Sequence, residues 1–146
     1  MKAVFARIVL LVIGISFPTL AQNPAENKVR VGFYNLENLF DTVNDPAIQD
    51  EEFLPEGINN WSVERYQQKL KNMAKAISGF APDILGVCEL ENRKVLEDLV
   101  TQPELAAKRY QIAHLDMDDL RGVDVALIYR PAVFKPFLIK KFKIKD

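Results

Sequence analysis

Alternating apolar positions mark the first strand that the sequence predicts. Val29, Val31 and Phe33 recur with a period of two, which is the spacing of a strand with one covered face. The pattern predicts a strand that ends near Asn35. The polar residues 22–28 in front of it predict a leader without regular structure.

Residues 62–82 show the next clear pattern, apolar positions with the period of a helix. Apolar residues three and four positions apart predict a helix that Ser62 caps and that Gly79 and Pro82 end. Its apolar positions are Tyr66, Leu70, Met73, Ile77 and Phe80.

The run 84–88 is continuously apolar and follows directly on that helix. This pattern predicts a strand buried on both faces in an α/β arrangement, with Glu89 at its carboxyl end. Further along, Asn92 caps a short predicted helix, and Pro103 opens another helical turn.

Two more strands are predicted, at 110–114 and 123–129, joined by a polar turn. The pair has the pattern of an antiparallel hairpin. In the basic tail, residues 141–145 alternate lysine with apolar side chains, which predicts a half-exposed strand. Strands mixed with helices in this order predict the α/β fold class.

The first residues predict a segment that is cleaved off and does not belong to the folded domain. Lys2 and Arg7 precede the apolar run 8–15, and small residues follow near position 21, which is the pattern of a secretory signal peptide over 1–21. A retained membrane anchor is the alternative, but the run is shorter than the roughly 20 apolar residues that a spanning helix needs. We therefore expect a secreted or periplasmic protein with no membrane span after cleavage.

Composition and charge narrow the picture further. With 49% hydrophobic and 27% charged residues, the chain has the profile of an ordinary folded domain. The 19 basic residues against 20 acidic ones exclude the basic excess that drives non-specific nucleic-acid binding. The acidic residues gather in a predicted loop over 41–60. The single Cys88 excludes an internal disulfide, and we interpret it as a buried strand residue rather than a reactive thiol.

Two polar residues stand where predicted strands end. Asn35 and Glu89 each follow an apolar strand, and ligands of open α/β sheets bind beyond the carboxyl ends of strands. Oxygen ligands without a His or Cys cluster favour a hard cation, Mg²⁺ or else Mn²⁺ or Ca²⁺, over zinc. The spacing alone also fits ordinary turn and capping roles, or an acid–base pair of Glu89 with Glu91.

Three segments carry a family resemblance: 33–41, 82–92 and 121–131. Together they resemble the endonuclease/exonuclease/phosphatase superfamily, in the form of a secreted bacterial member, over about Val29 to Lys143. The resemblance implies a metal-dependent phosphoester hydrolase of the nuclease or phosphatase type, built on a four-layer α/β sandwich of two mixed sheets flanked by helices. The corresponding domain is 29–146.

The resemblance also implies roles for single residues. Asn35 matches the asparagine that hydrogen-bonds near the scissile phosphate, and Glu89 matches the metal-ligating glutamate. Glu37 is either a second metal ligand or a solvated loop acid. His114 is either catalytic or a partly exposed, hydrogen-bonded residue, and Arg121 is either a phosphate clamp or a surface side chain.

Asp124 lies within a predicted apolar strand, where an unpaired carboxylate would be costly. We expect it to pair with Arg121 or with Arg130. That would make Asp124 a structural support, with an active-site role as the alternative.

The family's second half supplies an Asp-x-Asn pair and a late Asp-His pair, and neither follows Tyr129. The resemblance therefore implies an N-terminal half that lacks its C-terminal half and is inactive by itself. The alternative is a non-catalytic remnant or split-gene product that acts as a binding or structural module. Opposed charges on the loop and the tail leave the phosphoester substrate open between nucleic acid, phospholipid and sugar phosphate.

Overall fold

The computed structural model describes residues 28–142. The predicted signal peptide, nearly all of the predicted leader and residues 143–145 of the predicted tail strand lie outside the described residues. The described residues of that tail segment, 141 and 142, are not in a strand. Within 28–142, no helix combines the length and the apolar character needed to cross a membrane.

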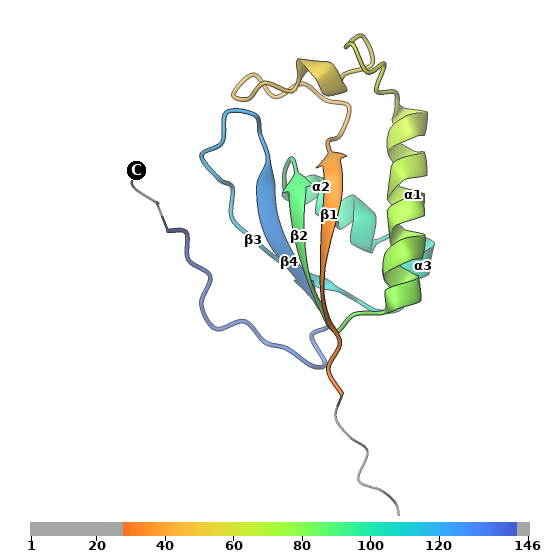
Figure 1. Ribbon diagram of the computed structural model, residues 1–146, viewed down its shortest axis with the longest axis vertical. Helices are drawn as coiled ribbons and strands as arrows, with labels where there is room; N and C mark the ends of the chain where they lie inside the picture. The colour runs from red at the N-terminus through yellow and green to blue at the C-terminus, as the bar shows by residue number, and fades with distance from the viewer. Residues whose placement is uncertain (1–27, 143–146) are drawn as a thin grey trace, which may run out of the picture.

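A mixed four-stranded sheet forms the centre of the fold (Figure 1). Its strands are β1 (Val31–Leu39), β2 (Ile84–Leu90), β3 (Gln111–His114) and β4 (Asp124–Tyr129), in the order β1-β2-β4-β3. β1 runs parallel to β2, while β4 is antiparallel to both β2 and β3. The α/β class and the predicted hairpin are therefore confirmed, with a single sheet in the described part of the chain.

The helices are α1 (Val63–Phe80), α2 (Arg93–Val100) and α3 (Pro103–Ala106), and a short 3₁₀ turn, η1 (Glu51–Phe53), interrupts the acidic loop. Two predicted caps are confirmed, because Ser62 Oγ accepts the backbone N–H of Arg65 and Asn92 Oδ1 accepts that of Val95.

The predicted stop signal of α1 is wrong in detail. Gly79 lies inside the helix, which ends at Phe80. Ala81 takes a left-handed conformation, with φ of 48°, and its N–H donates to the carbonyl of Ile77. This left-handed C-cap provides a donor for a carbonyl of the last helical turn, so the helix ends before it reaches Pro82.

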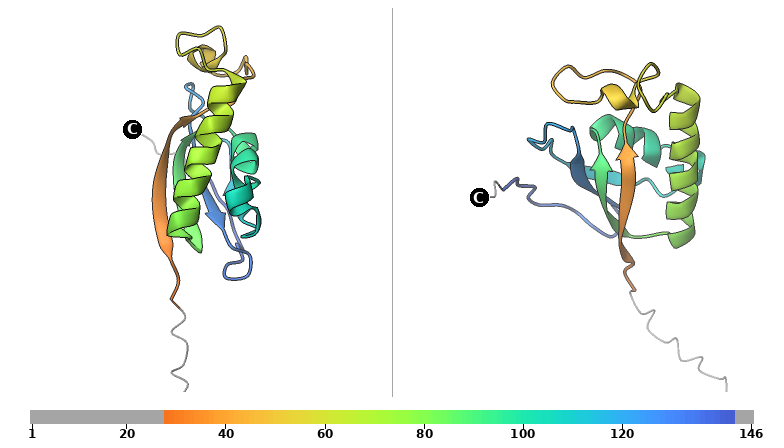
Figure 2. Two further views of the ribbon diagram at one scale, coloured as in Figure 1. Left: turned by 90° about the vertical axis from the view of Figure 1, so that its right-hand side faces the viewer. Right: turned by 45° about the horizontal axis from the view of Figure 1, so that its top comes forward.

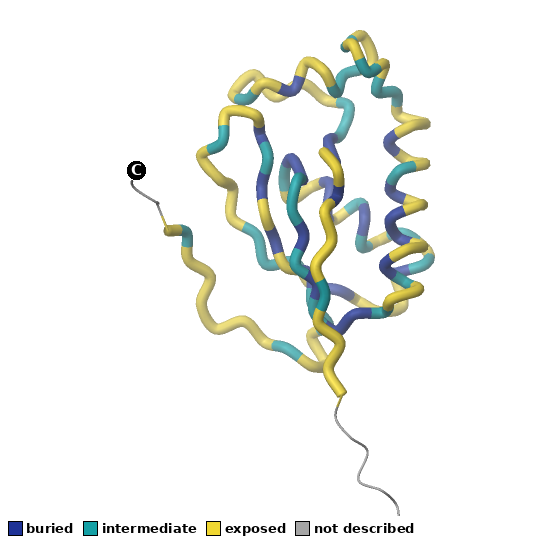
Figure 3. The backbone as a smooth tube through the Cα atoms, in the orientation of Figure 1, coloured by how far each residue is buried: buried dark blue, intermediate teal, exposed yellow. Residues whose placement is uncertain are grey.

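One face of the sheet is covered by the three helices, which gather on the same side in Figure 2. The buried residues of α1 lie on the side of the helix that faces the sheet (Figure 3). Leu85 and Val87 of β2 and Ala126 and Ile128 of β4 point into the core between the sheet and the helices. Because strand side chains alternate, the neighbours of these residues must point the other way.

The opposite face is apolar and uncovered in the described residues. Phe33 is 71% exposed, Val125 54% and Leu127 44%. The prediction that 84–88 is buried on both faces is therefore wrong, since Gly86 and Cys88 are only half-buried on this side. Cys88 does lie in a strand, and burial raises the pKa of its thiol, which disfavours the reactive thiolate.

Candidate active site

The carboxyl ends of β1 and β2 lie together at the upper edge of the sheet in Figure 1, below the acidic loop. The register of the two strands is regular up to Asn35, which is opposite Cys88, and then shifts until Leu39 meets Leu90. The β2–β4 register shifts at the same place. β1 thus continues beyond its predicted end, through an irregular segment.

Glu89 is the extra residue of this irregularity. Simple alternation after Leu85 and Val87 would send its side chain under the helices, but Leu90 is the next fully buried residue of β2. Glu89 instead has a left-handed backbone, with φ of 56°. A bulge of this kind redirects one side chain out of the regular pattern.

The structure brings Asn35 and Glu89 together. The Asn35 amide Nδ2 donates to Glu89 Oε1 at 2.8 Å. Asn35 is exposed and Glu89 half-buried, so the pair is open to solvent. The juxtaposition predicted from the strand ends is found, while the catalytic and metal-binding roles of the two residues stay predictions.

Glu37 and Asn38 continue the irregular backbone, with φ of 50° and 59°. The N–H of Glu37 donates to Asn35 Oδ1 at 2.6 Å, which fixes the asparagine amide from its other end. Left-handed conformations are rare outside glycine and cluster at functional sites. Three of them around one acid–amide pair single out this edge of the sheet.

Lys69 of α1 holds this segment in place. Its Nζ donates to the carbonyls of Glu37 and Asn38, at 2.5 and 2.9 Å. Burial lowers the pKa of Lys69, and the negative charges of Glu37 and Glu89 oppose that shift. The sequence analysis missed Lys69, because it lies on the polar side of the helical pattern and nothing in that pattern shows what it meets.

Glu91 does not pair with Glu89. It is 7% exposed and its Oε2 accepts the N–H of Asp41 at 2.7 Å. Burial raises its pKa to about 7, and the nearby charges of Asp41 and Asp50 add to that rise. Glu91 therefore anchors the start of the acidic loop instead of facing the solvent beside Glu89.

A second polar pair lies on the helix side of the same end of the sheet. His114 Nε2 is 2.7 Å from Asp124 Oδ2, and the two side chains are 3% and 4% exposed. Asp124 Oδ1 also accepts the N–H of Met117 at 2.8 Å. His114 is hydrogen-bonded, as the second of its two predicted roles expects, and the residue as a whole has intermediate exposure although its side chain is buried. The prediction for Asp124 is wrong, because Asp124 pairs with His114 instead of Arg121 or Arg130.

The two arginines have other partners. Arg121 forms a two-pronged contact with Asp119, through Nε at 3.1 Å and Nη2 at 2.7 Å. Its side chain is 74% exposed. Arg130 Nη1 is 2.7 Å from Asp83 Oδ1, at the other end of the sheet. Arg121 is close enough to feel the charge of Glu89, which contributes to a raised pKa after the larger effect of Asp119.

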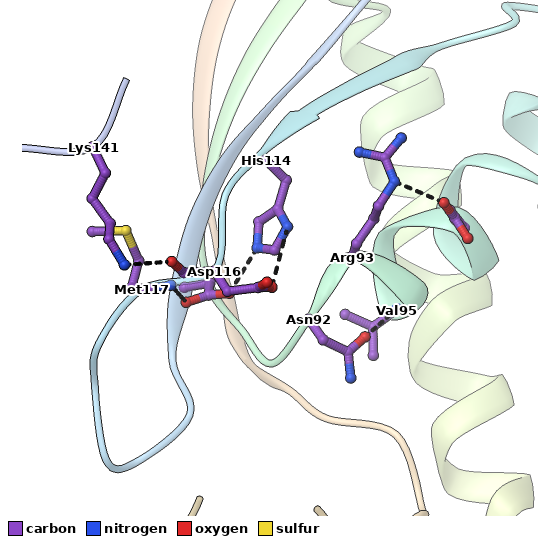
Figure 4. Close-up of polar contacts among 9 residues, drawn as sticks. Asn92, Arg93, Val95, His114, Asp116, Met117 and Lys141 are labelled. Carbon is purple, nitrogen blue, oxygen red and sulfur yellow. Dashed lines mark hydrogen bonds and ion pairs between the residues drawn. The ribbon is translucent and has the colours of Figure 1, made fainter. Parts of the chain in front are cut away.

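Two sets of ligand atoms are candidates for a cation. Atoms of His114, Asp116 and Asp124 lie within 4.8 Å of one another, and Figure 4 shows His114 beside Asp116. However, Asp124 already uses both oxygens in short hydrogen bonds, and His114 Nδ1 is 3.8 Å from the exposed Asp116. A cation held by all three would break buried contacts.

The Asn35–Glu89 pair fits a hard cation better. Glu89 offers a solvent-accessible carboxylate. The Asn35 amide donates to its Oε1 only, so Oε2 receives no hydrogen bond from Asn35. Mg²⁺ binds through one or two carboxylates and keeps several waters. This donor set suits that coordination without disturbing a buried group.

The described residues form an α/β domain with an acid and an amide at the carboxyl edge of its sheet, which is where open α/β sheets usually bind their ligands. The family model for the endonuclease/exonuclease/phosphatase family matches residues 30–146, and the chain belongs to this family. The family acts on phosphoesters and generally depends on divalent metal. No curated protein and no solved structure matches the chain significantly.

Proposed function

We propose that the chain carries the metal-binding edge of a secreted or periplasmic metal-dependent phosphoester hydrolase. The observation that carries the proposal is the solvent-accessible hydrogen bond of 2.8 Å between Asn35 and Glu89, formed at a bulge in a member of this family. The export pattern of residues 1–21 supports the proposed location.

Each residue has a defined task in this proposal. The Glu89 carboxylate holds a divalent cation, with Mg²⁺ the first candidate and Mn²⁺ and Ca²⁺ the others. When bound, such an ion neutralises negative charge on a phosphoryl oxygen. Asn35, fixed at both ends of its amide by Glu89 and the Glu37 N–H, positions the phosphate against that edge. Glu37 is a further candidate ligand.

Hydrolysis also needs a group that activates water, and the sequence has no Asp-x-Asn or Asp-His pair after Tyr129. We propose that another stretch of polypeptide supplies these groups and covers the open sheet face with the second sheet of the sandwich. Burial of the exposed Phe33, Val125 and Leu127 would stabilise that assembly. The chain alone then has little activity.

The test is hydrolysis of bis(p-nitrophenyl) phosphate by the chain with whatever coding sequence continues beyond codon 146. We expect activity with Mg²⁺ that EDTA abolishes, and we expect Glu89→Gln to lower it by about 10²-fold or more. Glu97→Gln removes the same charge from the exposed side of α2 and is the matched control. Full activity of Glu89→Gln would contradict the proposal.

The alternative function is that of a non-catalytic cation-binding or structural module. It predicts that the chain binds Mg²⁺ through Glu89 while the extended protein hydrolyses no phosphoester. The same pair of measurements therefore separates the two functions.

A further inference from the structure

A surface pocket of about 470 Å³ adjoins the Asn35–Glu89 edge. Two cations of α1, Arg65 and Lys69, line it, together with Glu37 and Trp61. Lys69 contacts the carbonyl of Glu37, whose own N–H contacts Asn35. The pocket is therefore next to the edge that we propose as the metal site, and its volume is in the usual range of ligand sites, about 300–1,000 Å³.

The two cations are held by one aromatic ring. The Arg65 guanidinium lies 5.6 Å and the Lys69 ammonium 5.3 Å from the centre of the Trp61 ring. The indole Nε1 donates to the carbonyl of Phe40 at 3.0 Å, which fixes the ring. Cations stacked on a fixed ring lose less freedom on binding a ligand, so the site is pre-organised.

Among residues 28–142, neither cation forms an ion pair with a carboxylate within 4.0 Å, although Lys69 feels the charges of Glu37 and Glu89. Arg65 donates through Nη1 alone, to the carbonyls of Asn59 and Asn60, so its Nε and Nη2 keep their hydrogens for another acceptor. Lys69 donates to two carbonyls and keeps a third hydrogen. Polarised donors of this kind suit a phosphate group, which accepts a forked guanidinium contact.

We propose that Arg65 and Lys69 bind a second phosphate group of the substrate, beside the phosphate that is cleaved at the Asn35–Glu89 edge. The proposal rests on the proposed function and narrows its substrate to molecules with more than one phosphate. Both a nucleic-acid strand and a sugar polyphosphate carry this chemistry.

The test is binding of fluorescent single-stranded DNA, followed by anisotropy in EDTA, with inositol hexakisphosphate as the second probe. The variant Arg65→Gln/Lys69→Gln is compared with Lys71→Gln/Lys75→Gln, which removes the same charge from exposed positions of the same helix outside the pocket. We expect the first variant to weaken binding at least about tenfold and to lower the salt slope by about one. The control variant should stay close to wild type.

Each outcome decides the proposal. Weaker binding in the Arg65→Gln/Lys69→Gln variant alone supports the proposal. The probe whose binding is weakened shows whether the phosphate belongs to a nucleic acid or to a sugar polyphosphate. Equal losses in both variants, or no binding of either probe by the wild type, would overturn it. The single variant Arg65→Gln is a check that should remain folded, because the Arg65 side chain contacts only two loop carbonyls and the face of the Trp61 ring. Since the assay contains no metal and measures no hydrolysis, failure of the subsite and failure of the proposed function are seen separately.

Discussion

Two polar pairs lie at the same end of the sheet and differ in what surrounds them. The Asn35–Glu89 pair lies at a bulge and is open to solvent, whereas the His114–Asp124 pair is almost completely buried. A buried pair with all its contacts made stabilises the fold and has little capacity for a ligand. An accessible carboxylate in a strained backbone has that capacity. This difference supports the proposal that Glu89 binds the cation while Asp124 stabilises the fold.

The largest effect is expected from Asp124→Ala. This change leaves the N–H of Met117 and the Nε2 of His114 without their buried partner, so we expect a loss of about 3 kcal/mol in the free energy of unfolding. Urea denaturation measures it. Asp116→Ala, at an 88% exposed side chain, should change stability by less than about 0.5 kcal/mol. Equal stability of wild type and Asp124→Ala would remove the supporting role of the pair.

A third pair, Asp83 with Arg130, sharpens the contrast from the far end of the sheet. The N–H of Arg30, followed by the Arg130 side chain, lowers the pKa of Asp83 below its usual 3.8. Its contribution is present above pH 3.8 and is lost as the pH falls through the lowered value. We expect Asp83→Asn to be less stable than wild type at pH 7, and the difference to vanish in strong acid.

Urea denaturation at several pH values checks this prediction. Asp119→Asn is the control, since its arginine partner is largely exposed and the pair contributes little. A stability difference for Asp83→Asn that grows as the pH falls would have the wrong sign and would contradict the assignment.

Asn35→Ala is expected to have a smaller effect on stability, below about 1 kcal/mol, because water replaces the lost partner of Glu89. The same change should weaken cation binding through a less well oriented carboxylate, by less than Glu89→Gln does. Thermal unfolding and calorimetric titration measure the two effects. A loss as large as that of Asp124→Ala would show that the accessible pair is structural too.

The smallest effect is expected from Arg121→Gln. Its two-pronged contact with Asp119 is exposed and spans a two-residue turn, so we expect a change of at most about 0.5 kcal/mol. The effect of this change on activity is more informative. If Arg121→Gln lowers phosphodiester hydrolysis by the chain tested with its downstream coding sequence and leaves stability unchanged, Arg121 acts as the phosphate clamp that the sequence analysis gave as one of its two roles. Unchanged hydrolysis would make Arg121 a surface residue.

The meeting of Asn35 and Glu89 was predictable, because parallel neighbouring strands end at the same edge of a sheet. The bulge that turns Glu89 outward was not, since it depends on the registers of three strands at once. The partner of Asp124 was missed because the sequence of the loop between β3 and β4 does not determine the register of the two strands. That register places His114 beside Asp124. The run 84–88 was wrongly predicted to be buried on both faces, since an apolar run has the same pattern whether or not a second layer covers it.

Binding of Mn²⁺, as a stand-in for Mg²⁺, tests the central assignment most directly. Calorimetric titration of the wild type, Glu89→Gln and Asp116→Asn compares the two candidate cation sites at equal loss of charge. The account predicts that Glu89→Gln weakens binding about tenfold or more and that Asp116→Asn leaves it unchanged. Binding that survives Glu89→Gln and disappears in Asp116→Asn would place the cation at His114 and contradict the account.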